Sequence, residues 1–193
     1  MHPLSSSFTT IANGGLLNVL KNQCGVSQAT TPPAVSGQIT HSSALPEIKE
    51  FTAIWDTGAT NSVITQNVVN SFGLQPITMT LVSGVGGDEM AEVYLVNIYL
   101  PNKVLFPHIR VTKGKLRDAD MLIGMDIMNQ GDFAVTNRGG ITKFSFRVPS
   151  EADIDFVQQH RQNASRVNVG HNGINKKKPK RHKTFGKNKR KKK

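Results

Sequence analysis

The residues with the clearest chemical potential lie in a short turn that follows an apolar stretch. Residues 50–55 alternate weakly between polar and apolar positions, as a strand does, and Asp56-Thr57-Gly58-Ala59 stops this pattern. A carboxylate such as Asp56 can serve as a general acid or base. The ordinary alternative is an aspartate that caps the loop. The triplet alone does not decide between these readings, because short motifs of this kind occur by chance.

Two further segments follow in a fixed order. Gly84-Val85-Gly86-Gly87 separates two strand patterns, residues 77–82 and 92–100, and predicts a hairpin with a glycine-rich tip. Leu122-Ile123-Gly124 is a short apolar run before a helical turn, in which Asp126 is expected to be the cap. Each segment is weak evidence alone, so their common order along the chain carries the interpretation.

Together the three segments resemble the motifs of the retropepsin-like (retroviral-type) aspartic proteases. Those proteins have an apolar strand into D-[ST]-G-[AST], a glycine-rich flap, and an apolar-apolar-glycine segment before a short helix. The resemblance covers about residues 48–148. It implies an aspartic endopeptidase that acts on peptide or protein substrates with apolar residues flanking the cleaved bond, without a metal or other cofactor.

The chemistry of such a site requires two carboxyl groups. Two carboxyls close together cannot both ionise, so they share one proton and supply both the base and the acid for attack of water on a peptide bond. The chain carries a single D-T-G. We therefore expect a homodimer with one Asp56 from each subunit at the two-fold axis.

The resemblance also implies roles for the residues beside the aspartate. Thr57 would brace the pair of aspartates across the dimer, and Gly58 would let the backbone approach the carboxylates and the substrate. A serine or threonine in place of Ala59 would donate a hydrogen bond that stabilises the charged carboxylate, which alanine cannot do. We therefore predict activity that extends toward neutral pH.

The other two motifs are expected to cover and support the site. The predicted flap consists of Gly84, Val85, Gly86 and Gly87. Its glycines would let it fold over a bound peptide and offer backbone N–H groups, and the valine at the tip would exclude water. The third motif consists of Leu122, Ile123 and Gly124. It would pack under the active-site loop. The apolar pair is expected to lie in the core, and the alternative is that it lines substrate pockets.

Two positions depart from the pattern of the retroviral enzymes. Those enzymes usually have an acid after D-T-G-A that pairs with an arginine after the third-motif glycine. Here the two positions hold Thr60 and Met125, so the ion pair is absent and other contacts must support the site. Trp55 is bulkier than the usual leucine or valine, which fits a divergent cellular or bacterial branch.

The pattern as a whole predicts an all-β fold, a small closed barrel or sandwich with one or two short helices. Several short strands at close spacing, few helical patterns and glycine-rich turns support this class. A brief helix is expected over Gln66–Phe72, with Thr65 as its cap and Gly73 at its end.

Composition suggests four regions around this fold. Residues 1–45 are a polar, flexible segment, hypothesised to be a propeptide removed by self-cleavage, and residues 46–149 form the protease domain. Residues 150–173 are a short helix and linker, in which residues 150–153 fit a capping box and the helix runs to about Gln162. Residues 174–193 form a disordered polybasic tail.

Charge and cysteine content exclude several classes of protein. The chain has a net charge of +11, but the tail holds 12 of its 24 basic residues and no acid, so the rest has a net charge of −1. The single Cys24 excludes an internal disulfide framework. No apolar run reaches the roughly 18 residues of a membrane span, and the N-terminus lacks a secretory signal. A cytoplasmic setting is the default, and in a nucleated cell the tail would also act as a nuclear-localisation signal.

Two other functions remain open at this stage. One is a retropepsin-like fold kept for dimerisation or binding without turnover. The other is nonspecific binding of nucleic acid or an anionic surface by the tail, since clustered lysines and arginines neutralise phosphates. Three histidines recur at intervals that fit no compact metal site, so we expect no metal.

Overall fold

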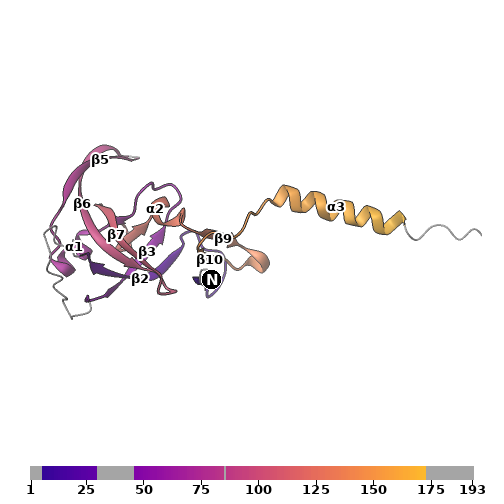
Figure 1. Cartoon of the computed structure of the whole chain (residues 1–193), viewed down its shortest axis with the longest axis horizontal. Helices are drawn as coiled ribbons and strands as arrows, with labels where there is room; N and C mark the ends of the chain where they lie inside the picture. The colour runs from indigo at the N-terminus through magenta and orange to yellow at the C-terminus, as the bar shows by residue number, and fades with distance from the viewer. Residues whose placement is uncertain (1–5, 30–45, 85, 173–193) are drawn as a thin grey trace, which may run out of the picture. The chain divides into compact units, whose positions relative to one another are not determined.

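The computed structural model of the 193-residue chain describes residues 6–29, 46–84 and 86–172 (Figure 1). Val85 and the basic tail lie outside the described residues. The chain divides into two units, Met1–Ala152 and Asp153–Lys193. The first unit is mostly strands with few short helices, as predicted. Its elements are β1 (Ser6–Ile11), β2 (Lys21–Gln28), β3 (Lys49–Trp55), β4 (Val63–Ile64), α1 (Gln66–Phe72), β5 (Thr78–Gly84), β6 (Gly87–Tyr99), β7 (Leu105–Lys113), β8 (Met121–Ile123), α2 (Met125–Met128), β9 (Asp132–Thr136), η1 (Arg138–Gly140) and β10 (Lys143–Val148).

Most of these strands close into a barrel. The hydrogen-bonded order is β2-β3-β8-β4-β7-β6-β5, and β6 also pairs with β2 through residues 25–28. The β5–β6 hairpin extends from this closed sheet and is paired up to Gly84 and Gly87. The prediction of a small closed β-barrel is therefore confirmed.

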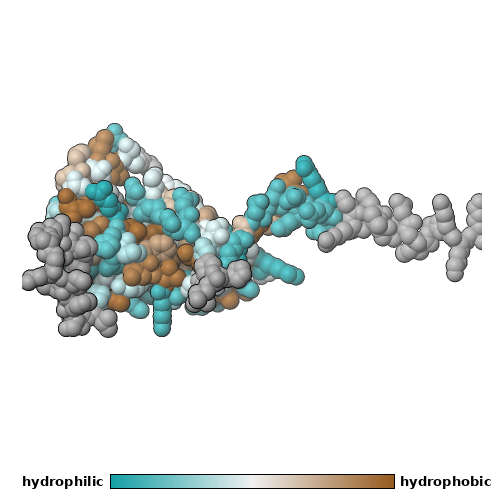
Figure 2. All heavy atoms as spheres, viewed as in Figure 1, coloured by the Kyte–Doolittle hydropathy of each residue, from teal (hydrophilic) through white to brown (hydrophobic). Residues whose placement is uncertain are grey.

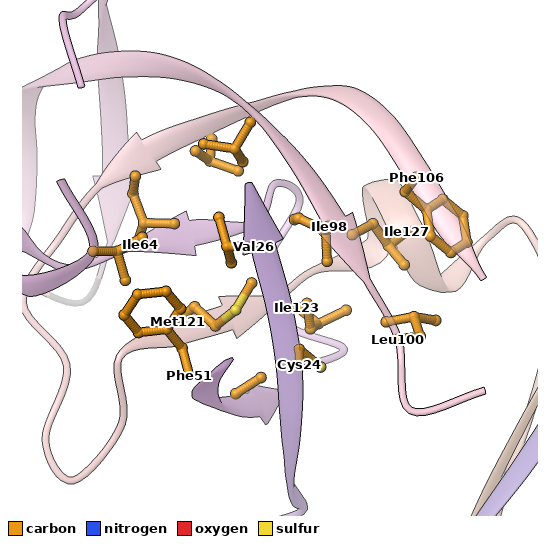
Figure 3. Close-up of a cluster of buried hydrophobic side chains, with 14 of the residues drawn as sticks. Cys24, Val26, Phe51, Ile64, Ile98, Leu100, Phe106, Met121, Ile123 and Ile127 are labelled. Carbon is orange, nitrogen blue, oxygen red and sulfur yellow. The ribbon is translucent and has the colours of Figure 1, made fainter. Parts of the chain in front are cut away.

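The barrel encloses an apolar core that follows from strand alternation. In β3, Phe51, Ala53 and Trp55 are buried, and the residues between them are half-buried. Figure 3 shows side chains from several strands meeting in this core, among them those of Cys24, Val26, Ile98, Met121 and Ile123. Burial raises the pKa of the Cys24 thiol to about 12, so this thiol stays protonated at neutral pH.

A second, smaller sheet has the order β1-β10-β9. In it, β1 pairs with β10 from Ser6 opposite Val148 to Ile11 opposite Lys143. The next strand, β2, pairs with β3 and β6 in the barrel. Over residues 6–29 the structure therefore differs from the flexible segment expected for residues 1–45, because β1 and β2 find their hydrogen-bonding partners far along the chain. Residues 1–5 and 30–45 lie outside the described residues.

Helix α1 has the predicted bounds but not the predicted cap. Gly73 follows its last residue with φ 60°, a left-handed conformation that suits glycine. Thr65 stands at the N-cap position, yet its hydroxyl makes no cap hydrogen bond and is buried without a partner among the described residues. Burial of Val68 and Val69 against the barrel therefore holds this helix more than its cap does.

The expected capping box at residues 150–153 does not begin a helix. The Ser150 hydroxyl donates to Asp132 Oδ1 at 2.5 Å, and the next two backbone N–H groups donate to Asp132 Oδ2 at 2.8 and 2.9 Å. Arg147 forms an ion pair with the same carboxylate at 2.7 Å. These hydrogen bonds hold the pKa of Asp132 well below its ordinary value, and the one from Ser150 has the largest effect.

The second unit contains α3 (Phe156–Asn172), which begins later and runs longer than predicted. Its cap is Asp155, whose Oδ1 accepts the N–H groups of Val157 and Gln158 at 2.8 and 3.0 Å. Over the described ranges of the chain, no helix is long and apolar enough to cross a membrane.

Candidate active site

Asp56 follows the last residue of β3 and is half-buried. Its backbone N–H donates to the carbonyl oxygen of Ile123 at 3.1 Å, which extends the parallel pairing of β3 with β8 by one residue. Its Oδ1 accepts the backbone N–H of Gly58 at 2.8 Å. Among the described residues, no hydrogen bond reaches Oδ2. The turn therefore orients the carboxylate through one of its two oxygens.

The residues after Asp56 form a tight turn. The N–H of Ala59 donates to the carbonyl oxygen of Asp56 at 3.3 Å. A Cβ at Gly58 would lie 3.2 Å from Asp56 Oδ1, so glycine permits the close approach of carboxylate and backbone. Thr57 is exposed. A residue that contacts a second subunit has to be exposed in the isolated chain.

The third motif lies directly beneath this turn. Its strand β8 runs parallel to β3 on one side and antiparallel to β4 on the other. Leu122 and Ile123 are 9% and 0% exposed. Ile123 belongs to the core cluster, whereas Leu122 alternates to the other face of β8 and is not part of that cluster. This central strand ties the aspartate turn to the barrel.

Glycine is required at position 124 because a side chain would not fit there, and not because of the backbone angles. Its φ of −96° is open to any residue. A Cβ there would lie 2.7 Å from the Asn61 carbonyl group and 2.9 Å from the carbonyl oxygen of Ala59. The active-site loop therefore packs on the end of β8 so closely that no side chain fits between them.

Backbone hydrogen bonds join the two loops at the positions where retroviral enzymes have an ion pair. The N–H of Met125 donates to Ala59 at 2.8 Å, and the N–H of Asp126 donates to Thr60 at 3.1 Å. Backbone peptide groups therefore connect the two loops, because the side chains of Thr60 and Met125 are uncharged and cannot form an ion pair.

A hydrogen-bond network between Ser62 and Asp126 strengthens this connection, and the sequence analysis missed it. The Ser62 hydroxyl donates to Asp126 Oδ1 at 2.8 Å and accepts the N–H of Gly124 at 3.1 Å. The Ser62 N–H donates to Asp126 Oδ2 at 2.9 Å. Asp126 also accepts the N–H of Ile127 at 3.0 Å, but it lies within the first turn of α2, whose N-cap is Gly124, so the prediction that Asp126 caps this helix is wrong. A polar serine beside the strand Val63–Ile64 was the available signal.

Trp55, the residue before the aspartate, is enclosed by aromatic rings of the small sheet. Its ring centroid lies 4.9 Å from Phe144, 5.2 Å from Phe146 and 5.9 Å from Phe8. Tilted pairs at these separations are favourable. The bulky residue at this position therefore connects β1 and β10 to the strand that carries Asp56.

The predicted flap is the end of the β5–β6 hairpin. Gly84 and Gly87 face each other at the end of the pairing, and Gly87 has φ 104°, which strongly favours glycine. Val85 lies outside the described residues. Met79, Leu81 and Met90 on one face of the hairpin are exposed, and Figure 2 shows apolar surface where Figure 1 draws β5. On the other face, Thr80 and Ala91 are half-buried.

A polar cavity of about 580 Å³ lies between α1 and the base of this hairpin. Glu92 is ion-paired with Lys113 there and accepts the hydroxyl of Tyr94 at 2.8 Å. The hydrogen bond from Lys113 has the largest effect on Glu92 and, together with the one from Tyr94, lowers the pKa of Glu92. Desolvation has the largest effect on Tyr94 and, together with the hydrogen bond to Glu92, raises the pKa of Tyr94 to about 12. None of the predicted site residues lines this cavity.

No cluster of three or more His, Cys, Asp or Glu side chains able to hold a metal ion occurs in the described part of the chain. Residues 47–130 match a protein family described as "gag-polyprotein putative aspartyl protease". The matched segment contains all three motifs, from Asp56 through the predicted flap to Gly124. No curated protein matches the chain in a sequence comparison.

Solved structures of proteases are also similar to the chain. A retropepsin-like aspartic protease from Rickettsia conorii is 12% identical, with a TM-score of 0.41 over 75% of this chain and 94% of that chain. EIAV protease complexed with the inhibitor HBY-793 is 23% identical, with a TM-score of 0.34 over 42% of this chain and 75% of that chain. Simian Foamy Virus (mac) protease is 18% identical, with a TM-score of 0.32 over 42% and 81%. The family assignment rests on the sequence match.

Proposed function

Residues 47–130 belong to the retropepsin-like aspartic protease family, and we propose that the protein is an aspartic endopeptidase that acts as a homodimer. The observation that carries this proposal is the setting of Asp56. Its carboxylate is oriented by Gly58 at the end of a buried strand, and no hydrogen bond from the described residues reaches its second oxygen. A second Asp56 would supply the missing half of the site.

In the proposed reaction, the two Asp56 carboxyls share one proton. The ionised carboxylate takes a proton from a water molecule, and the protonated one donates to the carbonyl oxygen of the peptide bond under attack. Water forms the new bond to the carbonyl carbon and gives a tetrahedral diol. The aspartate that took the proton from water then donates it to the amide nitrogen while the other aspartate takes back a hydroxyl proton, so that the C–N bond breaks and the amine and the carboxylic acid are released. One chain contributes one D-T-G, so the mechanism itself calls for a second copy.

The remaining motif residues have supporting roles in this proposal. Thr57 braces the two aspartates across the dimer, and Gly58 donates its N–H to the carboxylate. Ala59 has no hydroxyl to stabilise the ionised form, so the activity extends toward neutral pH. The flap is formed by Gly84, Val85, Gly86 and Gly87, and the floor under the site by Leu122, Ile123 and Gly124.

The test compares the wild type with Asp56→Asn on an unbiased peptide mixture between about pH 4 and 7.5. Cleavage sites are identified by mass spectrometry. The proposal expects cleavage by the wild type alone, inhibition by pepstatin-type compounds, and apolar residues on both sides of the cleaved bonds. Equal cleavage by the two proteins would show that another peptidase is responsible. Activity that falls from about pH 4 upward and is gone by about pH 6 would refute the reasoning from Ala59.

A second candidate function concerns the tail, and the observation that favours it is charge. Residues 174–193 hold 12 lysines and arginines and no acid. Such a segment is suited to neutralising the phosphates of a nucleic acid, with affinity that falls steeply as salt rises. Deleting these residues should remove binding to RNA or DNA and leave peptide cleavage unchanged. Binding that persists after the deletion would exclude the tail as the binding segment.

A further inference from the structure

The side chain of Asp56 belongs to the face of the barrel sheet that is turned away from the core. A row of paired residues crosses this face from β3 to β6 and consists of Ile54, Leu122, Val63, Thr112 and Val93. Their neighbours along the strands lie in the core, among them Ile123, Ile64 and Tyr94. Because side chains alternate along a strand, Asp56, two residues after Ile54, shares the face of the row.

The β5–β6 hairpin continues this face toward its tip. Val93, the last residue of the row, alternates with Ala91 and Glu89 along β6, so these three side chains share one face. Ala91 is half-buried, whereas Glu89, which lies opposite Val82, is exposed. The opposite face of the hairpin is the exposed apolar one described above. Asp56 and Glu89 therefore lie on the same face of one continuous sheet.

Glu89 is the charged residue on this face of the hairpin. The other acids at this end of β6 are Asp88 and Glu92, which alternate to the opposite face, and Glu92 is already ion-paired. In the described part of the chain, no ion pair involves Glu89. Arg110 shares the face of Glu89, but it lies opposite Leu95, which is about 20 Å from Glu89 along the strand.

We propose that Glu89 makes the protein select peptides with a lysine or arginine near the cleaved bond. This inference rests on the proposed function, in which the hairpin covers a peptide bound at Asp56. Covering the peptide removes water from Glu89, and a carboxylate that has neither water nor a partner is strongly unfavourable. A basic side chain of the peptide supplies the partner, whereas an acidic one adds repulsion.

The place of Glu89 in the hairpin indicates where the basic residue lies. Glu89 is two residues from Gly87, at which the pairing of the hairpin ends, and this separation is about 7 Å in a strand. An extended peptide spans the same distance in two residues. With the tip over the cleaved bond, the basic residue is therefore about two residues away from that bond. Each copy of a homodimer supplies one Glu89, so the basic residue is accepted on either side.

The charge of the whole site favours the same class of substrate. Two Asp56 carboxyls that share one proton carry one negative charge, and the two copies of Glu89 add to it. The residues of the row are uncharged, so they do not offset this charge and suit the apolar residues that flank the bond. A cleft lined by charges of one sign concentrates substrates of the opposite sign.

The test uses peptides that share one apolar pair at the cleaved bond and carry lysine, glutamine or glutamate two residues from it. The ratio of kcat/KM between these peptides is measured for the wild type, Glu89→Gln and Glu89→Lys. We expect the wild type to prefer lysine over glutamine about 10-fold, and Glu89→Gln to keep less than about 2-fold of this preference. Glu89→Lys should prefer glutamate. A merely structural role of Glu89 would not reverse the preference.

The matched control is Asp88→Asn, which removes the neighbouring charge from the opposite face of the hairpin and should keep the preference for lysine. Fluorescence of the single Trp55 shows whether each variant is folded. An active wild type that does not prefer lysine, or a preference that persists in Glu89→Gln, would overturn the role of Glu89 and leave the proposed function intact. A wild type that cleaves neither these peptides nor the unbiased mixture would overturn both.

Discussion

Replacing Ser62 with alanine tests the connection between the two loops of the candidate site. The Ser62 side chain is fully buried and makes two hydrogen bonds, to Asp126 Oδ1 and from the N–H of Gly124. A hydrogen bond to a charged group contributes about 1.5–3 kcal/mol, and a buried N–H left without a partner costs about 1–3 kcal/mol. In the variant, Asp126 still accepts the backbone N–H groups of Ser62 and Ile127, so its carboxylate loses only part of its hydrogen bonding. We expect the free energy of unfolding to fall by about 2–4 kcal/mol.

The assay is urea unfolding followed by circular dichroism and by the fluorescence of Trp55. The matched control is Ser145→Ala, which removes an exposed hydroxyl pair with Thr9 at 2.7 Å. This control should lower the free energy of unfolding by less than about 0.5 kcal/mol. If Ser62→Ala changed stability as little as Ser145→Ala does, the buried network would not be the connection that replaces the ion pair. The cleavage rate should also fall in Ser62→Ala, and more than its folded fraction explains.

Three further predictions concern other parts of the first unit. Gly124→Ala should destabilise the fold by about 2 kcal/mol or more in urea unfolding, because its Cβ would lie 2.7 Å from Asn61; an unchanged midpoint would refute this close packing. The pKa of Asp132 is lowered on folding, so its stabilisation is present above the unfolded value near 3.8 and is lost as pH falls below it. Asp132→Asn should therefore destabilise more at pH 6 than at about pH 3, and an equal loss at both would contradict the argument. Deleting residues 1–28 should abolish cooperative thermal unfolding, since β1 and β2 complete both sheets; a stable truncated protein would favour the propeptide hypothesis.

The parts of the fold that the sequence predicted are those governed by local signals. Helix α1 has its predicted bounds, and Gly73 ends it through a left-handed backbone conformation. The β5–β6 hairpin follows from alternating residues on both sides of a glycine-rich turn. In both cases the residues that decide the structure are neighbours in the chain.

The features that the sequence did not reveal depend on distant partners. The strand β2 reads as polar, yet its central residues are buried because β3 and β6 flank it on both sides. Ser150 has the spacing of a capping box, but Asp132 provides a stronger acceptor nearby in the fold. Ser62 and Asp126 are 64 residues apart, so neither side chain signals the other in the sequence.

In the candidate site, too, the local features could be predicted from the sequence, whereas the contacts between distant residues could not. The position of the aspartate turn at the end of a strand follows from residues 50–58 alone. The reason for Gly124 is the approach of Asn61, which only the packed structure reveals. The roles of the turn and flap residues in catalysis, and the dimer itself, stay predictions.

The central claim is that two copies of Asp56 form one active site, and a mixing experiment tests it most directly. Wild type and Asp56→Asn protein are unfolded together, refolded at a constant total concentration so that subunits exchange, and assayed for peptide cleavage. If both aspartates are needed, activity follows the square of the wild-type fraction, so an equal mixture retains about one quarter of the activity. An equal mixture that retained about half would mean that each chain acts alone, and would contradict the shared site.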